Sequence, residues 1–74
     1  MINIGSKVIV PSYEDESGVI VGESRLSLNG FSFDVWLVAE DNGFITVYDK
    51  ETQFEVESLE GNLILNENYC IKEI

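Results

Sequence analysis

The chain has 74 residues, of which 45% are hydrophobic, and its 14 acidic and 4 basic side chains give a net charge of −10. A chain of this length is expected to form one domain, residues 1–74, and its excess of acid disfavours direct binding to nucleic acid or to anionic membranes, since both attract basic surfaces. The single cysteine and the lack of histidine exclude an intrachain disulfide and a tetrahedral zinc site, which needs four nitrogen or sulfur ligands.

Short β-strands separated by polar turns are expected along the whole chain. Segments rich in β-branched and aromatic residues predict five strands, at residues 7–10, 18–24, 31–40, 44–49 and 53–57. The segment RLSLNG (25–30) is either a second loop or a hairpin extension that turns at Asn29-Gly30. A closing hairpin is predicted from Leu63-Ile64-Leu65 and Tyr69-Cys70-Ile71, around Asn66-Glu67-Asn68. The only helical candidate is Asp49 to Gly61, which keeps no clean helical period and could form a single turn at 57–61.

The layout of residues 4–57 begins with a short first strand (Lys7–Val10), a long polar loop (Ser12–Ser17) and a Gly-Val-Ile-Val strand (Gly18–Val21). A tight hairpin at Asp41-Asn42-Gly43 and a short fifth strand follow. This order resembles a Src-homology-3-like (SH3-like) small barrel of the Tudor or KOW kind. The resemblance implies an all-β barrel of five to seven short antiparallel strands, with a C-terminal hairpin extension. Such barrels are usually non-catalytic modules that bind peptides, modified side chains or nucleic acid.

The hairpin FDVWLVAEDNGFITVYDKE (33–51) could close in two registers. A two-residue type I′ turn at Asn42-Gly43 would set Val38 opposite Val47. A three-residue turn with a bulge at Gly43 would set Trp36 opposite Tyr48 and give one face without a charge: Val35, Leu37, Ala39, Ile45 and Val47. Because a one-residue slip exchanges the faces of a strand, this uncharged face favours the bulged register, with Gly43 at positive φ.

In the bulged register, Trp36 and Tyr48 are expected on the face away from the main core. Either the last hairpin or a long loop covers them as a second small core, or they form with Phe44 an aromatic patch that attracts cationic side chains. In the second case nearby carboxylates, and Tyr13 of the first loop, would join the patch. The carboxylates are Asp34, Glu40, Asp41 and Asp49 beside the hairpin, with Glu14, Asp15 and Glu16 of the first loop.

No catalytic constellation is visible. Without histidine the chain has no Ser–His or Cys–His dyad, and Cys70 lies in a strand pattern typical of a buried structural thiol. No glycine-rich phosphate loop occurs, and the hairpin fails the calcium-loop spacing because Val38 would occupy the first ligand position. We therefore expect no enzymatic activity, no metal and no cofactor.

Two functions fit these features. The leading one is a non-enzymatic, acidic protein-interaction module whose partner has a basic surface. One form of it is an inhibitor that occupies a nucleic-acid-binding groove as a mimic, a role that fits a virus- or mobile-element-encoded protein. The alternative is a structural or regulatory subunit, a monomer or weak homo-oligomer, that self-associates through the aromatic hairpin face. The net charge could also serve solubility alone. The lack of a cysteine pair, a signal sequence and a long apolar run predicts a cytoplasmic location.

Overall fold

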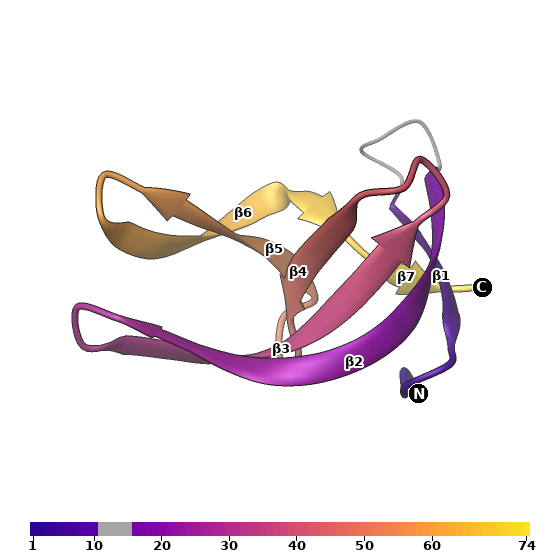
Figure 1. Ribbon diagram of the computed structural model, residues 1–74, viewed down its shortest axis with the longest axis horizontal. Helices are drawn as coiled ribbons and strands as arrows, with labels where there is room; N and C mark the ends of the chain where they lie inside the picture. The colour runs from indigo at the N-terminus through magenta and orange to yellow at the C-terminus, as the bar shows by residue number, and fades with distance from the viewer. Residues whose placement is uncertain (11–15) are drawn as a thin grey trace.

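The computed structural model describes residues 1–10 and 16–74, whose strands form one antiparallel sheet (Figure 1). The strand order is β6-β5-β4-β3-β2-β1-β7, and the described residues contain no helix. The all-β prediction is confirmed, and β3 has the predicted bounds, whereas β2, with 13 residues, is longer than the predicted 18–24. The strands are β1 (Lys7–Val10), β2 (Glu16–Leu28), β3 (Phe31–Glu40), β4 (Ile45–Asp49), β5 (Phe54–Leu59), β6 (Asn62–Cys70) and β7 (Lys72–Glu73).

The two edge strands of the sheet, β6 and β7, are consecutive in the chain and separated only by Ile71. The amide of Ile71 donates to the carbonyl of Gln53 at 3.1 Å, and the amide of Ile74 donates to the carbonyl of Lys7 at 3.0 Å. One segment therefore pairs with β5 and then with β1, which curls the sheet into a small barrel-like layout.

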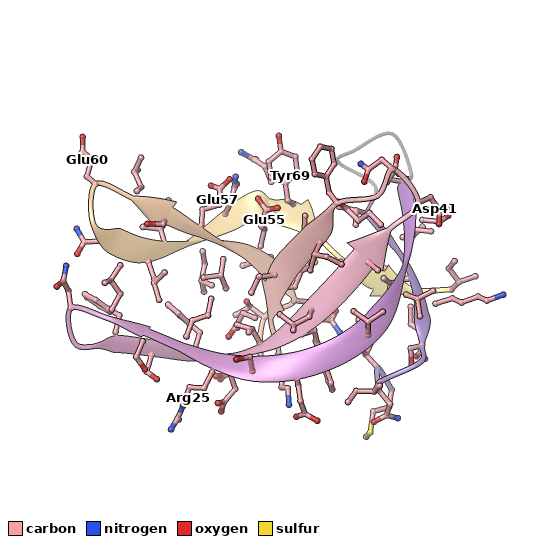
Figure 2. All side chains as sticks on the ribbon, in the orientation of Figure 1. Arg25, Asp41, Glu55, Glu57, Glu60 and Tyr69 are labelled. Atoms are coloured by element: carbon pink, nitrogen blue, oxygen red, sulfur yellow. The ribbon has the colours of Figure 1, made fainter. Side chains whose placement is uncertain are left out.

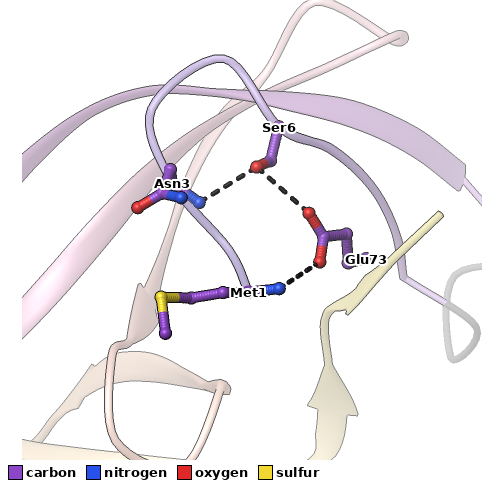
Figure 3. Close-up of polar contacts among 4 residues, drawn as sticks. All are labelled: Met1, Asn3, Ser6 and Glu73. Atoms are coloured by element: carbon purple, nitrogen blue, oxygen red, sulfur yellow. Dashed lines mark hydrogen bonds and ion pairs between the residues drawn. The ribbon is translucent and has the colours of Figure 1, made fainter.

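The N-terminus contacts β7 in the same region (Figure 3). The α-amino group of Met1 lies 2.9 Å from Oε1 of Glu73, and the hydroxyl of Ser6 donates to Oε2 of Glu73 at 3.3 Å. The bond from the α-amino group is the main reason that the pKa of Glu73 is lowered. These contacts are exposed, so we expect them to position the first residues more than to stabilise the fold.

The C-terminal hairpin is present but turns at a different place from the one predicted. It pairs β5 with β6 and turns at Glu60-Gly61, with φ values of 51° and 80°. The run Asn66-Glu67-Asn68 lies inside β6 and coincides with a shift of register, since Phe54 pairs with Cys70 while Glu55 pairs with Asn66. A polar run that suggested a turn is therefore a bulge.

The segment 25–30 forms the predicted hairpin extension. Leu28 pairs with Phe31, and the turn residues Asn29 and Gly30 have φ values of 50° and 83°. Positive φ at both positions is the signature of a type I′ turn, whose twist suits a two-residue hairpin. The helical turn considered at 57–61 does not form, since these residues belong to β5 and its turn.

The main core fills the barrel half of the molecule. Ile20 pairs with Val38, so both point to the same face of the sheet, and this face is closed by β1, Ile71 and the N-terminal residues. The buried cluster consists of Ile2, Val8, Val10, Ile20, Val38, Tyr48 and Ile71, with Trp36 packed against it.

Two hairpin arms extend from the barrel half toward the same side (Figure 1). The first arm is residues 22–34 of β2 and β3, and the second is residues 54–66 of β5 and β6. Their tips meet where Nδ2 of Asn29 donates to the carbonyl of Gly61 at 2.6 Å. Side chains occupy the space between the arms, whereas Arg25 and Glu60 point away from it (Figure 2). Val35 and Val56 are buried on this side, and its remaining apolar residues are half-buried: Leu26, Leu28, Phe33, Leu63 and Leu65.

Candidate functional site

The hairpin of β3 and β4 closes in the predicted bulged register. Trp36 pairs with Tyr48, Leu37 with Val47 and Ala39 with Ile45. Gly43 has a φ of 94°, and its amide donates to the carbonyl of Glu40 at 2.9 Å. The side-chain oxygen of Asn42 accepts from the amide of Phe44 at 2.9 Å, which fixes the turn locally.

The prediction that Trp36 and Tyr48 lie away from the main core is wrong. Tyr48 is 0% exposed within the main core, and Trp36 packs against it. Large aromatic side chains fill a barrel interior that β-branched residues alone would leave partly empty. The polar groups of this face are accommodated inside, since the Tyr48 hydroxyl points to Oε1 of Glu40 at 3.5 Å. Tyr48 is therefore unavailable to a partner in this structure.

A cation of the same chain already lies over the ring of Trp36. The ammonium of Lys50 lies 4.3 Å from its centroid and also pairs with the carboxylate of Glu23. A cation over an indole face is attracted by the ring quadrupole. The chain thus supplies internally the kind of contact that the sequence suggested for a partner.

Two of the predicted carboxylates are buried. Oδ2 of Asp49 accepts from the amide and the hydroxyl of Thr52, at 2.8 and 2.7 Å, and so builds the turn between β4 and β5. Burial raises the pKa of Glu40, and the nearby Glu16 carboxylate raises it further. Neither group forms part of an exposed acidic surface.

The remaining predicted residues lie at two separate places. Asp34 is exposed and pairs with Arg25 at 3.1 Å, where the first arm begins. Asp41 and Phe44 are exposed at the turn of the β3–β4 hairpin, and Oε1 of Glu16 accepts from the amide of Asn42 at 2.9 Å beside them. Glu14 and Asp15, like Tyr13, are outside the described residues. The structure therefore does not gather the predicted set into one patch.

An exposed apolar surface lies instead on the opposite side of the sheet from the main core. Val19 pairs with Ala39, which pairs with Ile45, and Leu37 pairs with Val47, so these side chains share one face. Val21 and Ile45 are 51% and 58% exposed. We call this surface the outer face: Val19, Val21, Leu37, Ala39, Ile45 and Val47. Four of its members belong to the uncharged set of five that the sequence predicted for the core, and the fifth, Val35, is buried on the side between the arms.

A pocket of about 600 Å³ lies where the first arm meets the turn between β4 and β5. Phe33 and Leu65 supply its apolar lining, and Ser32, Asp34, Lys50 and Glu51 lie around it. We call it the arm pocket. Sequence reasoning identified Asp34 but missed Phe33 and Leu65, because their meeting depends on the second arm folding over the first.

No protein-family model, curated protein or solved structure matches this chain. In the described ranges, no helix has the length and apolar character needed to cross a bilayer. Nor do three metal-ligating side chains come together among the residues described. The outer face and the arm pocket are the two candidate binding surfaces of the described residues.

Proposed function

We propose that this protein is a non-enzymatic protein-interaction module that binds a partner with a basic surface through its outer face. The observation that carries the proposal is the uncharged row of aliphatic side chains on three neighbouring strands, β2, β3 and β4. Val19, Val21 and Ile45 of this row are exposed, and Leu37, Ala39 and Val47 are half-buried. Soluble proteins rarely leave large contiguous apolar patches in water, and those that do commonly use them for binding.

The hairpin turn at one end of the outer face carries an exposed aromatic side chain and an exposed acid. Phe44 is 68% exposed at the hairpin turn, next to Ile45, and Asp41 is exposed in the same turn. Interfaces commonly combine an apolar centre with aromatic anchors and a polar rim. The net charge of −10 would steer a basic partner toward this protein and repel acidic ones.

Finer features of the proposal follow from the same observations. The barrel-like layout supports an SH3-like fold of the Tudor or KOW kind. The acidic charge supports an inhibitor that occupies a nucleic-acid-binding surface as a mimic. The location that we propose for it is the cytoplasm. Self-association through an aromatic face is not supported, because Tyr48 is buried and cannot contact a second copy. Pairing of two copies through the outer face would bring two strongly acidic chains together, so we expect a monomer or a weak homo-oligomer.

The test compares Ile45→Asp with a matched control, Leu59→Asp. Leu59 is 57% exposed and lies on the second arm, so both variants place one acid at an exposed aliphatic position. Immobilised wild-type protein and both variants are incubated with extract from the native host, and bound proteins are eluted with a salt gradient. Cross-linking with mass spectrometry then identifies the contacting residues.

The expected result is a basic protein that wild type and Leu59→Asp retain, that Ile45→Asp loses, and that cross-links beside the outer face. Its retention should fall steeply with salt, since the screening length is already about 8 Å at physiological ionic strength. Equal retention by Ile45→Asp would contradict the proposal. Sedimentation showing a stable wild-type dimer that Ile45→Asp dissociates would assign the outer face to self-association instead.

A further inference from the structure

The edge of β3 is unpaired over the first residues of the strand. β4 pairs with β3 from Val35 to Ala39, and one further bond joins the amide of Lys50 to the carbonyl of Asp34 at 2.9 Å. The chain then turns away toward β5, so Phe31–Phe33 have no neighbouring strand on that side.

The direction of the backbone groups at this edge follows from the ladder. The carbonyl of Asp34 and the amide of Glu40 both bond across to the β4 side, so even-numbered residues of β3 direct their backbone groups to that side. Three backbone groups therefore point to the free edge: the amide and the carbonyl of Ser32 and the amide of Asp34. Among the described residues none of these three groups has a hydrogen-bond partner.

The arm pocket lies beside this edge and has mixed chemistry. Phe33 and Leu65 line it, and their apolar side chains suit an aliphatic stem. Both of its cations are neutralised within the chain, since Arg25 pairs with Asp34 and Lys50 pairs with Glu23. Glu51 is exposed, and no ion pair or hydrogen bond engages its carboxylate within the described part of the chain. The pocket lining therefore combines apolar side chains with a carboxylate that no cation of the described residues neutralises.

We propose that the β3 edge at Phe31–Asp34 and the arm pocket together bind an extended segment of a basic protein. The segment would add a strand along β3, at the part of the edge where β4 no longer pairs. Its backbone would form hydrogen bonds with the free backbone groups of Ser32 and Asp34. A lysine or arginine of the segment would lay its stem over Phe33 and Leu65 and direct its charged end to Glu51. This site is separate from the outer face, and the proposal does not depend on binding there.

The test uses a random twelve-residue peptide library displayed on phage and selected on the full-length protein at physiological salt. Selected peptides are measured against Ser32→Pro and the matched control Ser27→Pro. Ser27 pairs directly with Ser32, and their hydroxyls lie 3.1 Å apart, so both variants lose the same hydroxyl contact. By the same ladder rule the amide of Ser27 points to the opposite edge of the arm. Proline is tolerated at strand edges because no ladder bond is lost there.

The expected result is a set of peptides enriched in lysine or arginine whose affinity falls about tenfold or more in Ser32→Pro and less than about twofold in Ser27→Pro. Glu51→Lys should weaken the same peptides about fivefold. In the wild-type protein, peptide binding should slow hydrogen exchange at the amides of Ser32 and Asp34, which tests the site without any variant.

Several outcomes would overturn the proposal. One is a selection that yields no peptide, or yields acidic peptides. Another is an equal loss of affinity in Ser27→Pro and Ser32→Pro. A third is unchanged exchange at Ser32 and Asp34 in the bound wild-type protein. Ile45→Asp should leave peptide affinity unchanged. The peptide measurements therefore test the site at the β3 edge separately from the proposal that a partner binds the outer face.

Discussion

The barrel half and the arms of this protein are built from the same strands but bury their side chains to different extents. In the barrel half β1, Ile71 and the N-terminal residues cover one face of the sheet, and Val8, Val38 and Tyr48 are all 0% exposed. In the arms two hairpins face each other, so Leu26, Leu63 and Leu65 stay half-buried. Side chains on the covered face of the barrel half are therefore more fully buried than those between the arms. The arms should therefore open locally at a lower free energy than the barrel half.

Truncating a core residue should separate the two regions most clearly. Tyr48→Ala should lower the free energy of unfolding by about 3–5 kcal/mol, because it leaves a cavity among residues that cannot collapse. Leu63→Ala in the second arm should cost about 1–2 kcal/mol, since less apolar surface leaves water there. Urea unfolding followed by tryptophan fluorescence measures both. Equal costs would show that the arms are as integral to the fold as the core.

Two glycines of β2 test the same contrast on one strand. A Cβ at Gly18 would lie 2.8 Å from Cγ1 of Val38 and 2.9 Å from the carbonyl of Ala39. Gly18→Ala should therefore cost about 1–3 kcal/mol by overpacking. At Gly22, where the first arm begins, the nearest atom is the flexible end of Leu37 at 3.4 Å. Gly22→Ala should cost less, as thermal unfolding of both variants would show. The reverse order would place the tight packing in the arm.

The turn glycines extend the contrast to backbone strain. Gly43 and Gly30 have φ values of 94° and 83°, and a Cβ at either position meets no atom within 4 Å. Alanine should cost about 1 kcal/mol at Gly43, because positive φ is disfavoured for residues with a Cβ. At Gly30 the tip of the arm can relax, so global stability should change less, while hydrogen exchange increases near Asn29. A neutral Gly43→Ala would contradict the bulged turn.

Local features of this fold could be predicted from the sequence, and long-range ones could not. The turns at Asn29-Gly30 and Gly43 follow from residues that accept positive φ, and the uncharged face gave the correct register of Trp36 and Tyr48. The pairing of β7 with β1 joins the two ends of the chain, and no local pattern encodes it.

The assignment of the two faces failed for a related reason. The uncharged set around Ala39 was predicted to be the core, but only its member Val35 is fully buried, whereas Tyr48 of the opposite face lies in the main core with Trp36 packed against it. The candidate site was then misplaced, since its aromatic residues faced inward. Charge pattern fixes which residues share a face, whereas only the curvature of the whole sheet decides which face is inside.

The smallest expected effect concerns the buried carboxyl of Glu40. Burial raises its pKa in the folded state above the ordinary value of the unfolded chain. Between these two pKa values the folded state binds more protons, so this group makes stability fall as pH rises through that window. Glu40→Gln should therefore be more stable than wild type at neutral pH, and the difference should vanish below the unfolded pKa. Glu60→Gln, at the exposed tip of the second arm, removes the same charge and serves as the control. If both variants shift the unfolding midpoint equally at pH 7, net charge and not burial of Glu40 explains the gain.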